Sequence, residues 1–149
     1  MPNLKDLAIT SPDIAHLERI ADDHAGLKGN RVPRLEVTGV PEGTVELALI
    51  MHDPDAPMPH GFTHWVVYGI EPGEKVEITE TTGRTAPNSD GKAEYVGPYP
   101  PAGHGQHHYY FWVYALNRKV EGEPTREEFL RDYADAVIEQ ARFVGTYSA

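Results

Sequence analysis

The chain has 149 residues, a formal net charge of -10 and no cysteine. This length favours one domain with one hydrophobic core, predicted here over residues 1–149. The lack of cysteine excludes disulfides, thiolate metal sites and a thiol nucleophile. Because binding to nucleic acid relies on clustered Lys and Arg, and no such cluster occurs, we expect no nucleic-acid partner.

The N-terminal sequence, Met1 to Asp6, lacks the basic start and the apolar run of a secretion signal. The longest apolar stretch, Tyr109 to Leu116, is much shorter than the roughly 20 residues of a membrane helix. We therefore predict a soluble, cytoplasmic protein without a transmembrane segment.

Short runs of apolar, aromatic and β-branched residues predict several strands. The first two runs are separated by a Gly/Pro-containing stretch, residues 39–43, which predicts a turn between them. The run at Tyr109 to Leu116 is apolar throughout, which predicts a strand buried on both faces. The predicted strands are Leu35 to Val37, Val45 to Met51, Trp65 to Tyr68, Val76 to Thr79 and Tyr109 to Leu116.

Two other segments have less regular patterns. Ser11 to Ala25 carries apolar residues at roughly helical spacing, but the pattern is too short to decide its structure. Gly83 to Gly97 contains four Gly or Pro residues and few apolar ones, so we predict a long surface loop there.

A helix is predicted near the C-terminus, from about Thr125 to Val144. Thr125 and Glu128 form a capping box after Pro124. Apolar residues then recur every four positions and predict a broad apolar face, with Gly145 ending the helix. These residues are Phe129, Tyr133, Val137 and Ala141, joined by Leu130, Ala134, Ile138 and Val144.

Three short motifs contain most of the polar groups that are suited to chemistry. The first, Met51 to Pro57, follows a predicted strand and includes Asp53 and Asp55 between prolines. Proline fixes φ and removes a donor, so a rigid turn that holds both carboxylates is expected. The same pattern is also typical of a turn whose Asp side chains only cap backbone N–H groups.

The second motif opens a strand with His64 and Trp65. Strand alternation would put His64 and Val66 on one face, and Trp65 and Val67 on the other. A histidine in such a position is more often packed and hydrogen-bonded than a ligand.

The third motif is a Pro/Gly loop, residues 97–106, that leads into the aromatic strand. Glycine lets a backbone approach a ligand closely, and N–H groups near Tyr99 can cradle an anion. Alternation places His107 and Tyr109 on one face and His108 on the other, so an imidazole and a phenol can point into one cavity.

Taken together, these motifs resemble the phosphatidylethanolamine-binding (Raf kinase inhibitor-like) family, in its short bacterial and archaeal branch. The resemblance extends from about Leu35 to Tyr147 and becomes vague towards the N-terminus. The segments that carry it are Asp53-Pro54-Asp55-Ala56-Pro57, His64-Trp65, Gly97-Pro98-Tyr99-Pro100-Pro101 with Gly103, and His107-His108-Tyr109.

The resemblance implies a mainly β fold, a Greek-key β-sandwich with a few peripheral helices and a pocket at one edge that binds phosphate-like or carboxylate anions. The chain has His108 where the family usually has Arg, and Asn117 where Asp is common. A fixed charge with a planar donor fork is thereby replaced by a group whose charge depends on pH. The implied ligand-binding residues are Asp53, Asp55, His64, Tyr99, Pro100, Pro101, His107 and Tyr109.

We therefore expect a non-catalytic anion-binding protein without a cofactor or metal. His64 and His107 would donate to the anion, Tyr109 would supply a hydroxyl, and Asp53 or Asp55 would orient an imidazole. Anion affinity should then rise as the pH falls through the histidine range.

Two alternatives use the same residues. Asp and His side chains with a water can carry out general acid/base hydrolysis. His60 with His64, or His104 with His107, can instead suggest a metal site that assists a hydrolase. Four residues of extended strand span roughly 13 Å, which is too far for the first pair to chelate. The other alternative is a regulatory protein whose pocket rim docks a kinase or a protease. The resemblance also implies a homodimer.

Overall fold

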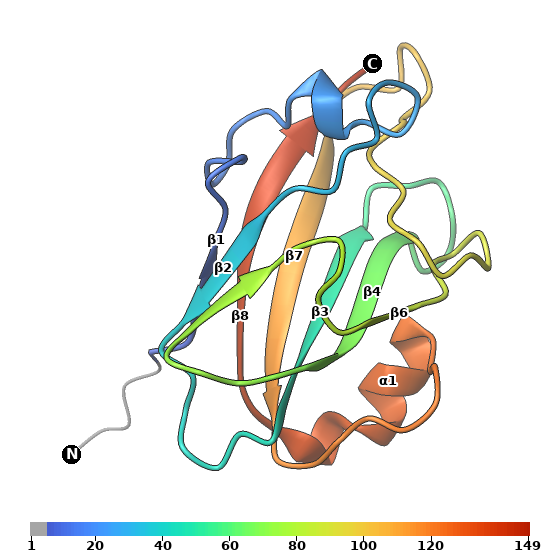
Figure 1. Cartoon of the computed structure of the whole chain (residues 1–149). Helices are drawn as coiled ribbons and strands as arrows, with labels where there is room; N and C mark the ends of the chain where they lie inside the picture. Colours follow the sequence, from blue (N-terminus) through green and yellow to red (C-terminus); the bar gives the residue numbers. More distant parts are fainter. Residues whose placement is uncertain (1–5) are drawn as a thin grey trace.

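The computed structural model describes residues 6–149, which form two antiparallel sheets (Figure 1). In spatial order, the three-stranded sheet contains β1 (Ala8–Thr10), β2 (Leu35–Thr38) and β5 (Lys75–Ile78). The five-stranded sheet contains β6 (Arg84–Ala86), β4 (Phe62–Ile70), β3 (Glu46–Asp53), β7 (His107–Leu116) and β8 (Val137–Tyr147). The helical elements are α1 (Arg126–Asp132) and the short 3-10 turns η1 (Asp22–His24) and η2 (Ala134–Ala136).

The five-stranded sheet contains the predicted Greek-key order. Strands β3, β4 and β6 follow one another across the sheet, and β7 returns by a long connection to pair with β3 on its other side. A fourth strand that returns to lie beside the first is the definition of this motif. The predicted mainly β sandwich with peripheral helices is thereby confirmed.

The main core lies between the two sheets. Alternate residues of β3 and β7, among them Leu49 and Phe111, point towards Val37 of β2 and Ile78 of β5. These side chains are essentially inaccessible to solvent. Their burial is the principal source of stability, at roughly 25 cal/mol for each Å² of apolar surface removed from water.

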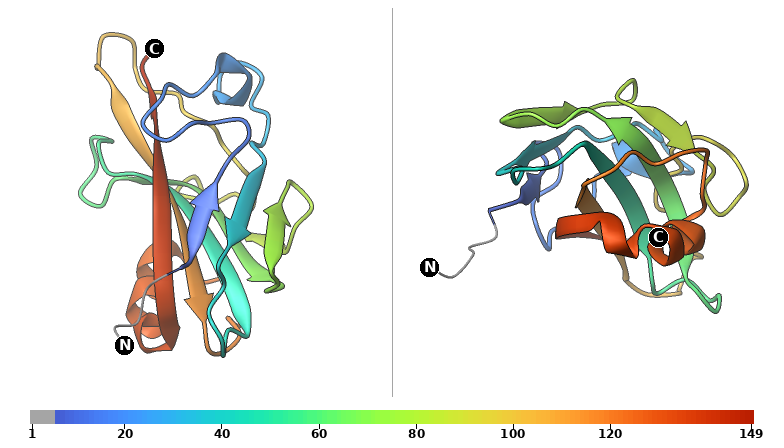
Figure 2. Two further views of the ribbon diagram at one scale, coloured as in Figure 1. Left: turned by 90° about the vertical axis from the view of Figure 1, so that its left-hand side faces the viewer. Right: turned by 90° about the horizontal axis from the view of Figure 1, so that it is seen from below.

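Helix α1 covers part of the opposite face of the five-stranded sheet. Phe129 packs on Tyr68 and Tyr114, with ring centroids 5.5 Å and 5.2 Å away. The right-hand view of Figure 2 places α1 and the three-stranded sheet on opposite faces. Beyond the helix, Tyr110 and Trp112 are only half-buried, so the prediction that β7 is buried on both faces is wrong at these two positions.

The predicted C-terminal helix begins as expected but is much shorter. The Thr125 capping box is present and α1 ends at Asp132, so the prediction of helix up to Val144 is wrong. From Val137 onwards the chain is β8, whose residues alternate between partly buried and exposed up to Arg142 and are all buried from Phe143, which stacks on Phe111 at 4.6 Å. The apolar residues after Val137 are spaced so that they fit the period of a helix and that of a strand. Pairing with β7 determines that this segment is a strand.

The other local predictions have mixed outcomes. The predicted surface loop from Gly83 to Gly97 includes β6 and the buried side chains of Asn88 and Tyr95. In the undecided segment from Ser11 to Ala25, only η1 at its end is helical. The predicted turn between the first two strands is confirmed at Glu42 and Gly43, and it joins the two layers, because the strands on either side belong to different sheets.

Within residues 6–149, no helix has both the length and the apolar character to cross a bilayer.

Candidate functional site

A pocket of about 250 Å³ lies at the end of the five-stranded sheet where β3 ends and where β4 and β7 begin. This is the upper end of the sheet in Figure 1. Seven of the eight predicted site residues line it, although they come from segments some fifty positions apart. The lining consists of Asp53, Ala56, Pro57, Met58, Phe62, His64, Tyr99, Pro100, Pro101, His107 and Tyr109.

A chain of hydrogen bonds leads from a buried carboxylate to the surface. Nδ1 of His107 lies 2.6 Å from Oδ2 of Asp53, and both side chains are almost fully buried. The other oxygen of Asp53 accepts the backbone N–H of Asp55 at 2.8 Å, which holds the turn after β3. Asp53 therefore orients His107 by accepting the proton of Nδ1, and Nε2 is the remaining polar atom of this ring.

In this structure, Nε2 of His107 is occupied by a neighbouring imidazole. Nδ1 of His104, an exposed residue in the loop before β7, lies 2.8 Å away. Two imidazole nitrogens this close share one proton, so one ring donates and the other accepts. A ligand that bonds to His107 through Nε2 must displace His104.

His64 reaches the pocket because of a β-bulge. On β3 the pairing passes from Met51 to His52, whereas on β4 it passes from Trp65 to Thr63, which leaves His64 as the extra residue. A bulge places two successive side chains on one face of a strand. His64 thus lines the pocket beside Phe62, although Trp65 faces the main core, and the predicted alternation of these two residues is wrong.

The imidazole of His64 is fixed and kept neutral by its surroundings. Nδ1 donates to the carbonyl of Val96 at 2.7 Å, and the N–H of Val96 donates back to the carbonyl of His64 at 3.1 Å. Burial lowers the pKa of His64 to about 4, although the Val96 carbonyl and the charge of Asp53 act in the opposite direction. The ring is therefore uncharged at neutral pH.

Aromatic rings form the rest of the wall. The ring of His64 meets the edges of Phe62 at 4.8 Å and Tyr109 at 5.2 Å. Tyr109 lies on the same face of β7 as His107, as alternation predicted, with ring centroids 6.4 Å apart. Burial, followed by the negative charges of Asp53 and Asp55, raises the pKa of Tyr109, so its hydroxyl keeps its proton as a donor.

The Pro/Gly loop forms one side of the pocket and is anchored on the N-terminal segment. The N–H of Gly97 donates to Oδ1 of Asn30 at 2.7 Å, and Pro98 accepts the N–H of Gly26 at 2.8 Å. A Cβ on Gly97 would lie 1.8 Å from the carbonyl oxygen of His24, so only glycine permits this approach. Tyr99 follows, with part of its ring exposed.

Asp55 is the one predicted site residue that does not line the pocket. Its Oδ2 accepts both the backbone N–H and Nδ1 of His108, each at 2.8 Å, on the exposed side of β7. Partial burial disfavours ionisation of Asp55, but the contacts with His108 outweigh it and keep the pKa of this carboxyl below its usual value. His108, which stands where the family usually has Arg, thus joins the two motifs outside the pocket.

Sequence reasoning missed the apolar wall formed by Ala56, Pro57, Met58 and Phe62. Ala56 and Pro57 belong to the first motif, so their closeness to Asp53 in the sequence could have indicated that they line the pocket. Met58 and Phe62 carried no signal of their own, because single apolar residues in a loop are common on protein surfaces.

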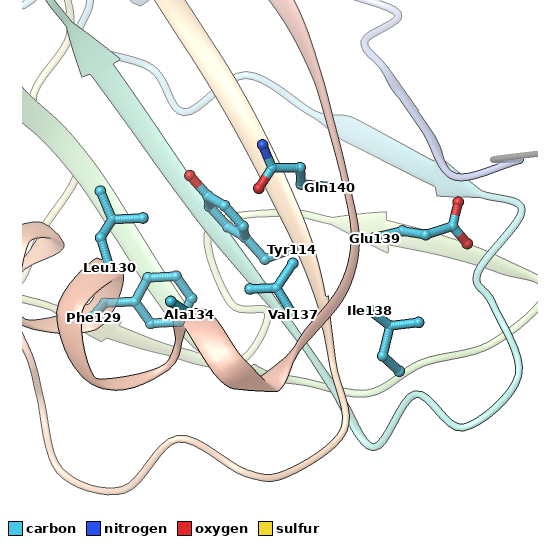
Figure 3. A pocket seen from close by; sticks show the side chains of 8 residues that line it. All are labelled: Tyr114, Phe129, Leu130, Ala134, Val137, Ile138, Glu139 and Gln140. Atoms are coloured by element: carbon cyan, nitrogen blue, oxygen red, sulfur yellow. The ribbon is translucent and has the colours of Figure 1, made fainter.

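A second hollow, of about 350 Å³, lies between α1 and the adjoining parts of β7 and β8. Figure 3 shows Phe129 and Leu130 of α1 on one side and Tyr114 of β7 on another. Glu139 is its one charged lining residue, so its electrostatics disfavour an anion. Among residues 6–149, no three His, Asp or Glu side chains are grouped so that they can hold a metal ion.

Comparisons with known proteins agree with this architecture. The family model described as phosphatidylethanolamine-binding protein matches residues 10–148. A Mycobacterium tuberculosis protein named as a lipoprotein, LppC, is 38% identical over 98% of this chain and 74% of its own length. The UPF0098 protein PYRAB11530 of Pyrococcus abyssi is 36% identical over 77% of this chain and 70% of its own length.

Two solved structures are similar throughout. E. coli YBCL, described as a new member of the mammalian PEBP family, has a TM-score of 0.87 at 28% identity and covers 97% of this chain and 99% of its own. A homologue from Chlamydia trachomatis, CT736, has a TM-score of 0.87 at 27% identity, covering 98% of this chain and 99% of its own. With a family model that matches almost its whole length, this chain belongs to the phosphatidylethanolamine-binding protein family.

Proposed function

We propose that the protein binds a small oxyanion, such as phosphate or a phosphoethanolamine-like headgroup, in the pocket at the end of β3, β4 and β7. The observation that carries the proposal is the convergence of His64, His107 and Tyr109 on one small hollow, with Asp53 orienting His107. Polar groups that converge in a partly apolar pocket are typical of a small-molecule site.

The β7 side of the pocket supplies the donors. Tyr109 offers its hydroxyl, and His107 donates from Nε2 when its ring carries both protons and His104 has moved away. Hydrogen bonds from a charged imidazole to an anion are stronger than those between neutral groups. Affinity should therefore be higher when His107 carries both protons than when its ring is neutral.

Calorimetric titration with inorganic phosphate and phosphoethanolamine tests this proposal. Tyr109→Phe removes only one hydroxyl, and Tyr110→Phe is its matched control, because Tyr110 lies on the opposite face and stacks on Trp112. We expect Tyr109→Phe to weaken binding roughly tenfold and Tyr110→Phe to leave it unchanged. Equal effects of the two changes, or no binding by the wild type, would refute the proposal.

A hydrolase is the second candidate, because a buried Asp–His pair beside a pocket is also the arrangement of a general base. Turnover of a panel of phosphate and carboxylate esters that is lost on His107→Ala, but not on His108→Ala, would favour it.

Docking of a kinase or protease, a homodimer and a cytoplasmic location remain predictions. A pull-down whose target is lost on His107→Ala would support docking at the pocket.

A further inference from the structure

The two nitrogens of His64 have different roles, and the structure assigns them. The carbonyl of Val96 can only accept, so the nitrogen that lies 2.7 Å from it, Nδ1, carries a hydrogen. The reciprocal bond from the N–H of Val96 fixes the relative position of the two residues. In a neutral imidazole, the other nitrogen, Nε2, then has a lone pair and no hydrogen.

The surroundings of His64 keep that lone pair free. His64 is 3% exposed, and among residues 6–149 no hydrogen bond joins Nε2 to another group, although the backbone of Gly97, next to Val96, also acts to raise the pKa of the ring. Asp53 of β3 is already bonded to His107, while Asp90 and Tyr99 of the loops contact each other at 3.5 Å. None of these groups bonds to His64, and burial of the ring outweighs the charges of Asp53 and Asp90, which favour a second proton.

The pocket is therefore asymmetric. The β7 side presents donors, the Tyr109 hydroxyl and His107 in its doubly protonated form, whereas His64 on β4 presents an acceptor. An oxyanion without a proton can satisfy the donors, but one of its oxygens would then face the Nε2 lone pair. Two acceptors placed against each other in a buried site repel and leave both without a partner.

We infer that the oxyanion bound here still carries a proton and donates it to Nε2 of His64, which selects inorganic phosphate and phosphate monoesters over sulfate and phosphodiesters. This inference rests on the proposed anion-binding function and narrows its ligand class. Phosphate monoesters have a second pKa near about 6, so a substantial fraction of the monoanion exists at neutral pH. Sulfate and phosphodiesters have no such proton.

The test compares four ions by calorimetric titration at about pH 6: phosphate against sulfate, and methyl phosphate against dimethyl phosphate. The expected result is binding of the first of each pair, with the second at least about tenfold weaker. Between about pH 7 and pH 9, phosphate affinity should fall by about tenfold for each pH unit, as the monoanion disappears. Equal affinity for phosphate and sulfate would overturn the inference while leaving the anion site in place.

Two other outcomes would also overturn the inference. Binding of glycerophosphoethanolamine without binding of phosphate would mean that an ammonium group, and not a protonated oxyanion, meets Nε2. Failure of every anion to bind would refute the proposed function itself, and the selectivity with it.

A variant and a spectrum provide independent checks. The amide of His64→Gln can rotate to donate, so the preference for phosphate over sulfate should decrease towards unity, whereas His108→Gln, outside the pocket, should keep it. Nitrogen-15 spectra of the ligand-free wild type near pH 7 should show a proton on Nδ1 of His64 and none on Nε2. A doubly protonated ring, or a proton on Nε2, would overturn the inference even if the variant fails to fold.

Discussion

Lowering the pH from about 7.5 to about 4.5 should destabilise the protein through the buried imidazole of His64. Burial lowers the pKa of this ring from 6.5 to about 4 in the folded state, while the unfolded chain keeps the ordinary value. Between these two values the unfolded state binds more protons, so the free energy of unfolding decreases as the pH falls. The loss begins below about pH 6.5 and is complete near the folded pKa.

The size of this effect follows from the shift. Each pKa unit corresponds to about 1.4 kcal/mol, and at pH 4.5 most of the difference is realised, giving a loss of about 2.5 kcal/mol from His64 alone. Burial also lowers the pKa of His52 to about 4, so His52 adds to the loss in the same direction. A loss of this size is a large part of the stability of an ordinary domain.

Urea denaturation of the wild type and of His64→Asn at the two pH values measures the contribution of His64. The Asn amide can still donate to the Val96 carbonyl but does not titrate, and the titration of every other group is common to both proteins. The pH-dependent loss should be about 2.5 kcal/mol smaller in the variant. An equal loss in both proteins would show that the buried imidazole is not the cause.

Three further substitutions test other parts of the structure. His104→Ala frees Nε2 of His107, so phosphate should bind roughly threefold to tenfold more tightly by calorimetry; weaker binding would mean that His104 belongs to the site. Gly145→Ala would bring a Cβ within 2.7 Å of Ile20 and should lower the free energy of unfolding in urea by about 1–3 kcal/mol. Gly73→Ala, whose new Cβ would have its nearest neighbour at 3.8 Å, should change it little, and equal losses would contradict the packing around Gly145. Thr125→Ala removes the cap of α1 and should cost about 1 kcal/mol; no change in urea midpoint would contradict the cap.

The successes and failures of the sequence analysis follow from the range of the interactions. The capping box at Thr125 and the strand at Tyr109 to Leu116 were correct because nearby residues decide them. Beyond Val137, the spacing of apolar residues fits a helix and a strand alike, and the pairing of β8 with β7 decided between them. A local pattern cannot contain that information.

The candidate site shows the same division between what nearby residues determine and what the tertiary structure determines. The sequence by itself determined which groups are present: a turn with two carboxylates, an imidazole and a phenol on one face of β7, and a stiff loop before them. Only the tertiary structure decided that Asp53 orients His107 while Asp55 turns outwards to His108, and that a bulge turns His64 into the pocket. It also decided which nitrogen of a neutral His64 carries the hydrogen, because the carbonyl that accepts it belongs to Val96, thirty-two residues along the chain.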